Sequence, residues 1–163
     1  MSGRRLHVRV GELRVVDQGA TLFTPGIGSC VAVALRDRTA PIGGLAHALL
    51  PEPRTAAEPE RAGRYVTTAV RATIERLEGA GVDPARLVAW IAGGATMFRG
   101  LAGSGPSIGD RNVAAARATL TAAGIPILGE AVGGEFGRSL QFDVAAGTVR
   151  VSTALRGHVI LGL

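Results

Sequence analysis

Runs of hydrophobic residues, some alternating with polar residues and some continuous, divide the chain into short strands and two helices. Partial alternation over residues 6–16 predicts a strand with a bend or bulge at Gly11. Further strands are predicted at residues 20–24, 30–35, 42–50, 87–92, 126–132, 140–144 and 148–153, the last two as a hairpin. The short segment at residues 20–24 is the weakest of these eight, so we expect about seven strands.

Two segments have apolar residues at helical spacing. The first covers residues 64–77 and is closed by Gly79 and Gly81, and the second begins at Asp110 as its N-cap and ends near Gly124. Short turns join neighbouring strands, which favours antiparallel pairing. The predicted fold class is α+β, with helices layered on a mixed, mostly antiparallel sheet, in a single domain over residues 1–163.

The basic composition raises the question of a nucleic-acid partner. Net charge is +5 and the sequence pI is about 11.1. However, all 18 basic residues are arginines, they are scattered along the chain, and aromatic residues make up only 4%. Because base-stacking side chains are scarce, we expect no nucleic-acid partner.

Other classes of protein are also disfavoured. No apolar run approaches the roughly 20 residues of a membrane span, and the N-terminal residues lack the apolar stretch of a signal peptide, so we expect a cytoplasmic protein. One cysteine cannot form an internal disulfide or a multi-thiolate zinc site. The three histidines lack i, i+4 spacing. We expect neither a metal nor a cofactor.

Cys30 is the first candidate for chemistry. It follows a turn-rich loop that contains Gly26, Gly28 and Ser29, and it precedes a predicted strand. Successive N–H groups in such a loop can hold the oxyanion of a tetrahedral intermediate. The alternative is that Cys30 is a small buried hydrophobic residue, which is the commoner role of a lone cysteine.

His47 strengthens the catalytic interpretation. If a turn is centred between Arg38 and Thr39, the strands at 30–35 and 42–50 pair so that Cys30 lies opposite His47 on one face. A histidine partner would lower the pKa of the thiol. Thr24 lies six residues before Cys30 and can orient the imidazole as a third member of a triad. Alternatively, His47 is a core histidine and Thr24 a strand-end residue.

Several motifs resemble the CheD family of chemoreceptor glutamine deamidases. Residues 24–37 (TPGIGSCVAVALRD) and 42–51 (IGGLAHALLP) resemble its signature. Further matches are Arg64-Tyr65, Gly93-Gly94-Ala95 with Met97, Ile108 to Asn112, and Gly133-Gly134 with Gly137-Arg138. They follow in order over about residues 10–150, and the spacing of Thr24, Cys30 and His47 is that of the family.

The resemblance implies a fold and an activity. The fold would be a layered α/β sandwich similar to the catalytic domain of cytotoxic necrotising factor toxins. The site would be Cys30, His47 and Thr24, with loop N–H groups at Gly28 and Ser29. The chain would be a protein-glutamine glutaminase that hydrolyses glutamine amides on cytoplasmic helices of chemoreceptors through a thioester, and a CheC-type phosphatase would be a partner.

Alternatives remain open at this point. One alternative is a non-catalytic chemotaxis module that binds a phosphatase or receptors. Another is a cysteine amidase that acts on small amides in a closed pocket. Arg111 and Asn112 are alternatively just the start of a helix. Three positions depart from the family pattern and put the substrate surface in question: Ala131 for a frequent Asp, Trp90 for a common Lys, and Ala48 for a bulky residue.

Overall fold

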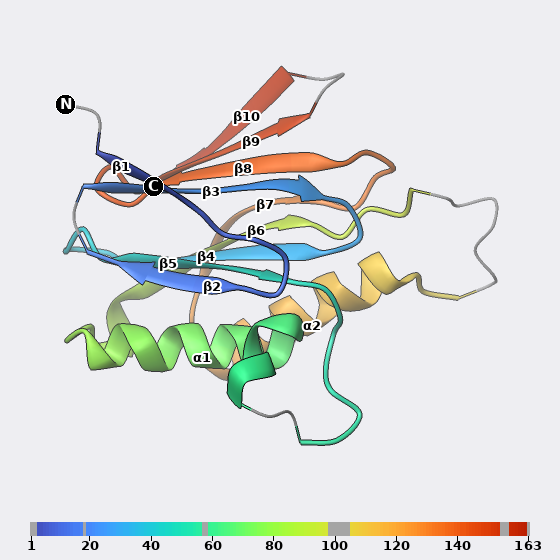
Figure 1. The fold of residues 1–163 in the computed structure, drawn as a ribbon, viewed down its shortest axis with the longest axis horizontal. Helices are drawn as coiled ribbons and strands as arrows, with labels where there is room; N and C mark the ends of the chain where they lie inside the picture. The colour runs from blue at the N-terminus through green and yellow to red at the C-terminus, as the bar shows by residue number, and fades with distance from the viewer. Residues whose placement is uncertain (1–2, 18, 57–58, 98–104, 154–156, 163) are drawn as a thin grey trace.

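The chain folds into three layers, two β-sheets and a layer of helices (Figure 1). The computed structural model describes residues 3–17, 19–56, 59–97, 105–153 and 157–162. The outer sheet has the order β1 (Arg4–His7), β3 (Ala20–Ile27), β8 (Arg138–Asp143), β9 (Thr148–Thr153) and β10 (Gly157–Gly162). The central sheet has the order β2 (Leu13–Val16), β5 (Gly43–Ala48), β4 (Val31–Asp37), β6 (Leu87–Gly93) and β7 (Ile127–Val132). Helices α1 (Val66–Gly79) and α2 (Ile108–Ala122) cover the central sheet, and η1 (Pro59–Arg64) and η2 (Pro84–Arg86) are short 3₁₀ turns.

The predicted class, α+β with mostly antiparallel pairing, is confirmed. Only the β1–β3 and β6–β7 pairs among the described strands are parallel. Two details differ from the prediction. Residues 6–16 form two strands in different sheets, because Gly11 turns the chain with a φ of 83°. Strand β10 was not predicted at all.

The start of α2 also differs from the prediction. Ser107, rather than Asp110, is the N-cap. The Ser107 side chain accepts a hydrogen bond from the Asp110 N–H, and the Asp110 carboxylate accepts one from the Ser107 N–H. Asp110 is thus the third residue of a capping box, a role that its sequence position alone does not distinguish from that of the cap.

The β4–β5 hairpin has a different register from the predicted one. His47 lies opposite Ala32, and Leu35 lies opposite Gly44. The cause is Asp37, whose carboxylate accepts hydrogen bonds from the N–H groups of Thr39 and Ala40. These bonds centre the turn one residue later than expected, which moves every cross-strand partner by two residues. The predicted pairing of Cys30 with His47 is therefore wrong, but a shift of two keeps both side chains on the predicted face.

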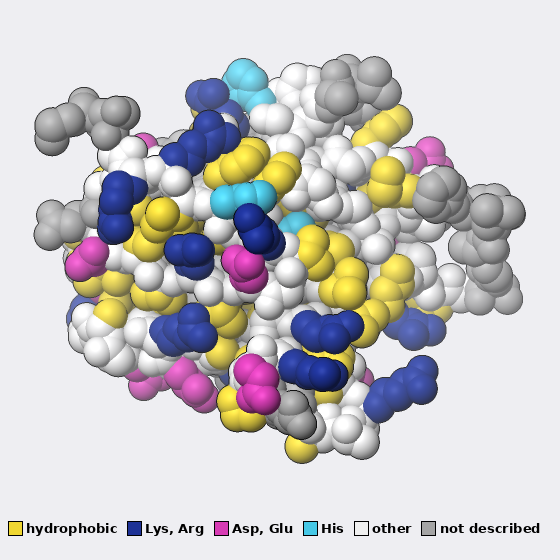
Figure 2. Space-filling view, in the orientation of Figure 1, with side chains coloured by type: hydrophobic (Ala, Val, Ile, Leu, Met, Phe, Trp, Pro, Cys, Tyr) yellow, Lys and Arg dark blue, Asp and Glu magenta, His cyan; other side chains and the backbone are white. Residues whose placement is uncertain are grey.

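Buried charges cluster at this turn, although most arginines are spread over the surface among acidic and apolar side chains (Figure 2). Arg36 is 7% exposed and donates to the carbonyls of Asp37, Val144 and Ala145. The fully buried Asp37 pairs with Arg86 at 3.0 Å. Burial raises the pKa of Asp37. The hydrogen bonds from Arg86 and the turn N–H groups lower the pKa by a larger amount, so it lies well below its usual value.

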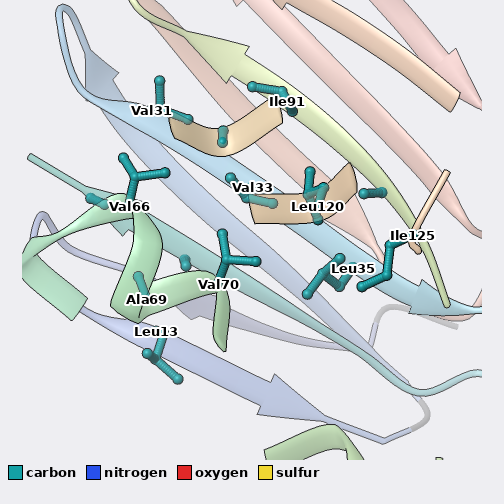
Figure 3. Packing of buried hydrophobic residues seen from close by; sticks show 14 of the residues in the cluster. Leu13, Val31, Val33, Leu35, Val66, Ala69, Val70, Ile91, Leu120 and Ile125 are labelled. Atoms are coloured by element: carbon teal, nitrogen blue, oxygen red, sulfur yellow. The ribbon is translucent and has the colours of Figure 1, made fainter. Parts of the chain in front are cut away.

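The central sheet is buried on both faces. One core cluster packs its helix-facing side, including Val31, Val33 and Leu35, against α1 and α2 (Figure 3). A second cluster fills the space between the sheets and includes Cys30 and Ala32. The outer sheet covers the face that carries Cys30, and Cys30, just before β4 at the open end of the hairpin, is 7% exposed.

Candidate active site

Thr24 connects the two sheets through a buried hydrogen-bond chain. Its Oγ1 lies 2.5 Å from the Val8 carbonyl oxygen and 2.7 Å from Nδ1 of His47. A hydroxyl has one proton and a carbonyl only accepts, so Thr24 donates to Val8. It must then accept from the Nδ1–H of His47. This assignment leaves Nε2 of the neutral imidazole with an unshared electron pair.

His47 is a neutral imidazole rather than a resident cation. It is fully buried in β5, and its Nε2 has no hydrogen-bond partner among the described residues. Burial and, to a lesser extent, the charge of His7 lower the pKa of His47 to about 4. The imidazole is therefore neutral at pH 7. A buried, unsatisfied basic nitrogen costs stability, and such atoms are typical of functional sites.

Cys30 lies just before β4, on the same face of the central sheet as His47. It is 7% exposed and its thiol is not in a disulfide. Because Ala32 is the partner of His47, Cys30 is a diagonal neighbour, within reach of a long side chain such as histidine. Thiol and imidazole are not hydrogen-bonded in this structure. Catalytic contacts are often long without substrate and shorten when it binds.

The loop before Cys30 is held by its carbonyl groups. The oxygens of Gly28 and Cys30 accept hydrogen bonds from the N–H groups of Ala95 and Gly94, at 2.9 and 2.8 Å. The Ser29 oxygen accepts one from the Asn112 side chain. Within the described residues, the N–H groups of Gly28 and Ser29 donate no hydrogen bond, and that of Cys30 interacts only with its own thiol. None of these donors is bonded to another residue, so they can hold an oxyanion.

Gly93 is required for the support of this loop. It has a φ of 115°, and a Cβ atom there would lie 2.3 Å from the carbonyl oxygen of Cys30. Gly94, with a φ of 67°, would place a Cβ 2.9 Å from the oxygen of Gly109 in α2. Both positions therefore exclude other residues. The sequence-based match at Gly93-Gly94 thus corresponds to the place where β6, α2 and the cysteine loop meet.

Asn112 was matched within a family motif, but the sequence did not assign it to the candidate site. It lies fully buried in α2, and its Nδ2 donates to the carbonyls of Ser29 at 2.8 Å and Leu49 at 3.1 Å. One amide thus joins the residue before Cys30 to the segment that follows His47. Its Oδ1 has no partner among the described residues. The available signal was an asparagine on the apolar face of an amphipathic helix.

The electrostatics of Cys30 differ from the sequence-based expectation. A histidine partner and loop N–H groups were expected to lower the pKa of the thiol. Burial instead raises it, and the backbone N–H of Cys30 offsets only part of that effect. The resting pair is a neutral thiol with a neutral imidazole. Proton transfer to His47 would then accompany attack on a substrate instead of preceding it.

Among the described residues, no group of three or more histidine, cysteine, aspartate or glutamate side chains is arranged to hold a metal ion. No helix in the described part of the chain is long and apolar enough to cross a membrane.

Comparison with known proteins supplies the family. The protein-family model described as CheD chemotactic sensory transduction matches residues 49–153 of this chain. A protein of Geobacter metallireducens named "Probable chemoreceptor glutamine deamidase CheD 2" is 46% identical over 148 residues, which cover 90% of this chain and 91% of the relative. The "Chemoreceptor glutamine deamidase CheD" of Thermotoga maritima is 38% identical over 144 residues, 88% of each chain. This chain belongs to the CheD family.

Among solved structures, a DUF152 protein of Neisseria meningitidis resembles the chain over 80% of its length and 62% of that protein's own, with a TM-score of 0.48 and 15% identity.

Two of the departures from the CheD pattern lie in the core. Trp90 is fully buried between the sheets and packs against Phe142, with ring centroids 5.8 Å apart. Ala48 is 2% exposed and faces the helices. Because both side chains are buried, these two departures do not bear on the substrate surface. Ala131 is half-buried in β7.

Proposed function

We propose that this chain is a protein-glutamine deamidase that converts glutamine side chains on the cytoplasmic helices of chemoreceptors to glutamate. The observation that carries the proposal is the Thr24–His47 hydrogen bond, because it leaves Nε2 basic on the face that carries Cys30. The names of the CheD relatives supply the substrate class. A cytoplasmic location follows from that substrate.

In the first half-reaction the Cys30 sulfur attacks the amide carbon of the glutamine. His47 takes the thiol proton at Nε2 as the carbon–sulfur bond forms, since both groups are neutral at rest. The oxyanion is stabilised by the unoccupied N–H groups of the loop from Gly28 to Cys30. His47 then gives its proton to the amide nitrogen. The carbon–nitrogen bond breaks, ammonia leaves, and the substrate remains attached to Cys30 as a thioester.

In the second half-reaction a water molecule attacks the thioester carbon. His47 takes a proton from the water at Nε2 and returns it to the sulfur as the carbon–sulfur bond breaks. The products are a glutamate side chain and the regenerated thiol. Throughout both half-reactions the Thr24 hydroxyl oxygen accepts a hydrogen bond from the Nδ1–H of His47, which stabilises the imidazolium form. The proposed chemistry uses no cofactor.

The decisive experiment measures deamidation of a chemoreceptor cytoplasmic fragment by peptide mass spectrometry. The wild-type protein should convert specific glutamines to glutamate and release equal amounts of ammonia. Cys30→Ala should reduce the rate by at least roughly 10⁴-fold without loss of the fold, since it removes one small side chain. Full activity in Cys30→Ala would contradict the nucleophile assignment.

The alternative, a non-catalytic module that binds receptors or a phosphatase, is favoured by one observation. Cys30 and His47 are not hydrogen-bonded in this structure. Ammonia release separates the two functions, because a binding module would hold the fragment without changing its mass. A CheC-type partner and similarity to the cytotoxic necrotising factor domain stay predictions from the family resemblance.

A further inference from the structure

A large groove lies outside the candidate active site. It has a volume of about 1050 Å³ and runs between residues 50–56, which follow β5, and the outward faces of α1 and α2. In the common orientation of Figures 1 and 2, several basic side chains lie at the lower right, where the segment between β5 and η1 is drawn. The groove is lined by Arg54, Arg61, Arg71 and Arg111, and we call it the basic groove.

The positive charge of the basic groove is not neutralised within the described part of the protein. All four arginines are exposed, and none has an ion-pair partner among the described residues. Of the residues that the structure describes, Glu52 is the one acidic residue that lines the groove. Arg111 lies in the second turn of α2, near the helix end where the macrodipole disfavours a cation. Four unpaired guanidinium groups around one groove fit a partner with several carboxylates.

The floor of the basic groove suits a helix. Ala114, Ala118 and Ala122 follow one another at four-residue spacing on the exposed side of α2. They form a low ridge without polar side chains, which lets another backbone approach closely. From Ile108 to Ala122, residues of α2 line the groove over roughly 21 Å, the length of four helical turns. A compact ligand would leave most of that length unoccupied.

The basic groove begins beside the active site. Leu50 and Arg111 line it, and each is the chain neighbour of a residue in the Asn112 link, Leu49 or Asn112 itself. That link also reaches Ser29, the residue before Cys30. In Figure 1, the end of β5, the start of β4 and the start of α2 lie at the same end of the molecule. A helix held in the groove is therefore adjacent to the opening to Cys30.

We propose that the basic groove binds an acidic α-helical face of the substrate protein and holds it while a neighbouring glutamine enters the site. This inference rests on the proposed deamidase function and extends it to substrate selection. Each turnover replaces a neutral amide with a carboxylate. A helix that already carries one product glutamate is consequently a better ligand for the groove, so successive glutamines on one helix are modified with increasing affinity.

The test uses the full chain and a chemoreceptor cytoplasmic fragment, with KM and kcat measured for deamidation. The groove variant is the double substitution Arg71→Glu with Arg111→Glu, both at exposed positions. The matched control is Arg150→Glu, which reverses an exposed charge on β9 of the outer sheet. A second substrate is a short glutamine peptide without acidic residues. A third is the fragment with one target glutamine already replaced by glutamate.

The groove variant should raise KM for the fragment by roughly tenfold or more, with kcat within about twofold of wild type. The control should match wild type on every substrate. Turnover of the short peptide should be the same for all three proteins. Wild-type KM should rise with salt and should be about threefold lower for the pre-deamidated fragment. The groove variant should lose both of these effects.

An unchanged KM in the groove variant would overturn the groove proposal while deamidation by the wild type still stands. If the groove substitutions change self-association instead of KM, the occupant is a second copy of this chain and the proposal is also overturned. If the wild-type protein does not deamidate the fragment, the proposed function fails separately. Direct binding of the labelled fragment then tests the groove, and equal binding by wild type and groove variant would reject it.

Discussion

The two ends of the β4–β5 hairpin both hold buried polar side chains, but they differ in how many of the polar atoms have a hydrogen-bond partner. At the turn end, Asp37 accepts hydrogen bonds from Thr39, Ala40 and Arg86. The neighbouring Arg36 uses all three of its nitrogens. At the open end, Nε2 of His47 and Oδ1 of Asn112 have no partner within the described residues.

This difference separates a structural polar cluster from a chemical one. A buried polar group that is fully hydrogen-bonded stabilises a particular fold, whereas an unsatisfied one costs about 1–3 kcal/mol. The unpartnered Nε2 of His47, on the face that carries Cys30, fits the proposed role of His47 as a base. The comparison predicts that changes at the open end affect rate more than stability, and that changes at the turn end do the opposite.

The largest effect is expected for His47→Leu. Removal of the proposed base should lower deamidation by roughly 10³–10⁴-fold. The free energy of unfolding should change by less than about 1 kcal/mol, because the variant also removes an unsatisfied buried nitrogen. Fragment deamidation and urea unfolding measure the two quantities. His158→Leu, at an exposed position on β10, is the control and should affect neither. A strong loss of stability without loss of rate would make His47 a structural residue.

A smaller loss of rate is expected for Thr24→Val. Valine has the shape of threonine but cannot accept from Nδ1–H of His47, so the imidazole loses its fixed tautomer and orientation. The kcat should fall by roughly 100-fold, measured per folded molecule because the Val8 carbonyl also loses its donor. Thr24→Ser keeps the hydroxyl and should retain most of the activity. Equal rates for the valine and serine variants would show that the hydroxyl has no catalytic effect.

At the turn end, Asp37→Asn should reduce stability rather than rate. Loss of the charge-assisted hydrogen bonds should cost about 2 kcal/mol in the free energy of unfolding at pH 7. The pKa of Asp37 is lower in the folded than in the unfolded protein, so its contribution is complete above about pH 4 and is lost as the pH falls below that value.

The difference between wild type and Asp37→Asn in urea unfolding should accordingly narrow below pH 4. The exposed Asp17→Asn is the control and should leave the free energy of unfolding unchanged. If Asp37→Asn lowers kcat per folded molecule and leaves stability unchanged, the turn end of the hairpin has a chemical role and not the structural role assigned to it.

Asn112→Asp should have a moderate effect on rate. A carboxylate cannot donate to the carbonyls of Ser29 and Leu49, so the cysteine loop loses its link to the segment after His47. The kcat should fall by roughly tenfold with KM unchanged. Thr119→Val alters another buried polar residue of α2, one that contacts only Ala115 through its hydroxyl, and should leave kcat unchanged. Equal effects of the two variants on kcat would reduce Asn112 to a general packing role.

The smallest effect is a shift in the pH dependence of kcat/KM and of Cys30 alkylation. With a His47 pKa of about 4, the acid limb of kcat/KM should fall near pH 4 instead of near the usual histidine value of about 6.5. Because burial raises the pKa of the Cys30 thiol, alkylation of Cys30 should have its midpoint above about 8.5. A midpoint well below that value would indicate a resident thiolate and would contradict the neutral-pair mechanism.

The sequence alone determined the class of fold, the main helices and the three candidate residues. Periodicity located α1 and most strands of the central sheet because burial on a sheet or helix face imposes a regular spacing of apolar residues. It also placed Cys30 and His47 on one face although the predicted register was wrong, because an error of two residues leaves each side chain on the same face. The spacing of Thr24, Cys30 and His47 carried the family resemblance.

The tertiary structure alone decided how those residues meet and which others support them. The hairpin register depended on hydrogen bonds from the turn to the Asp37 side chain, and the tautomer of His47 depended on Val8, 16 residues before Thr24 in the chain. Asn112 became part of the site because α2 packs against the open end of the hairpin. The raised pKa of Cys30 follows from coverage by a second sheet. Each of these depends on contacts between segments far apart in the sequence, which local patterns do not encode.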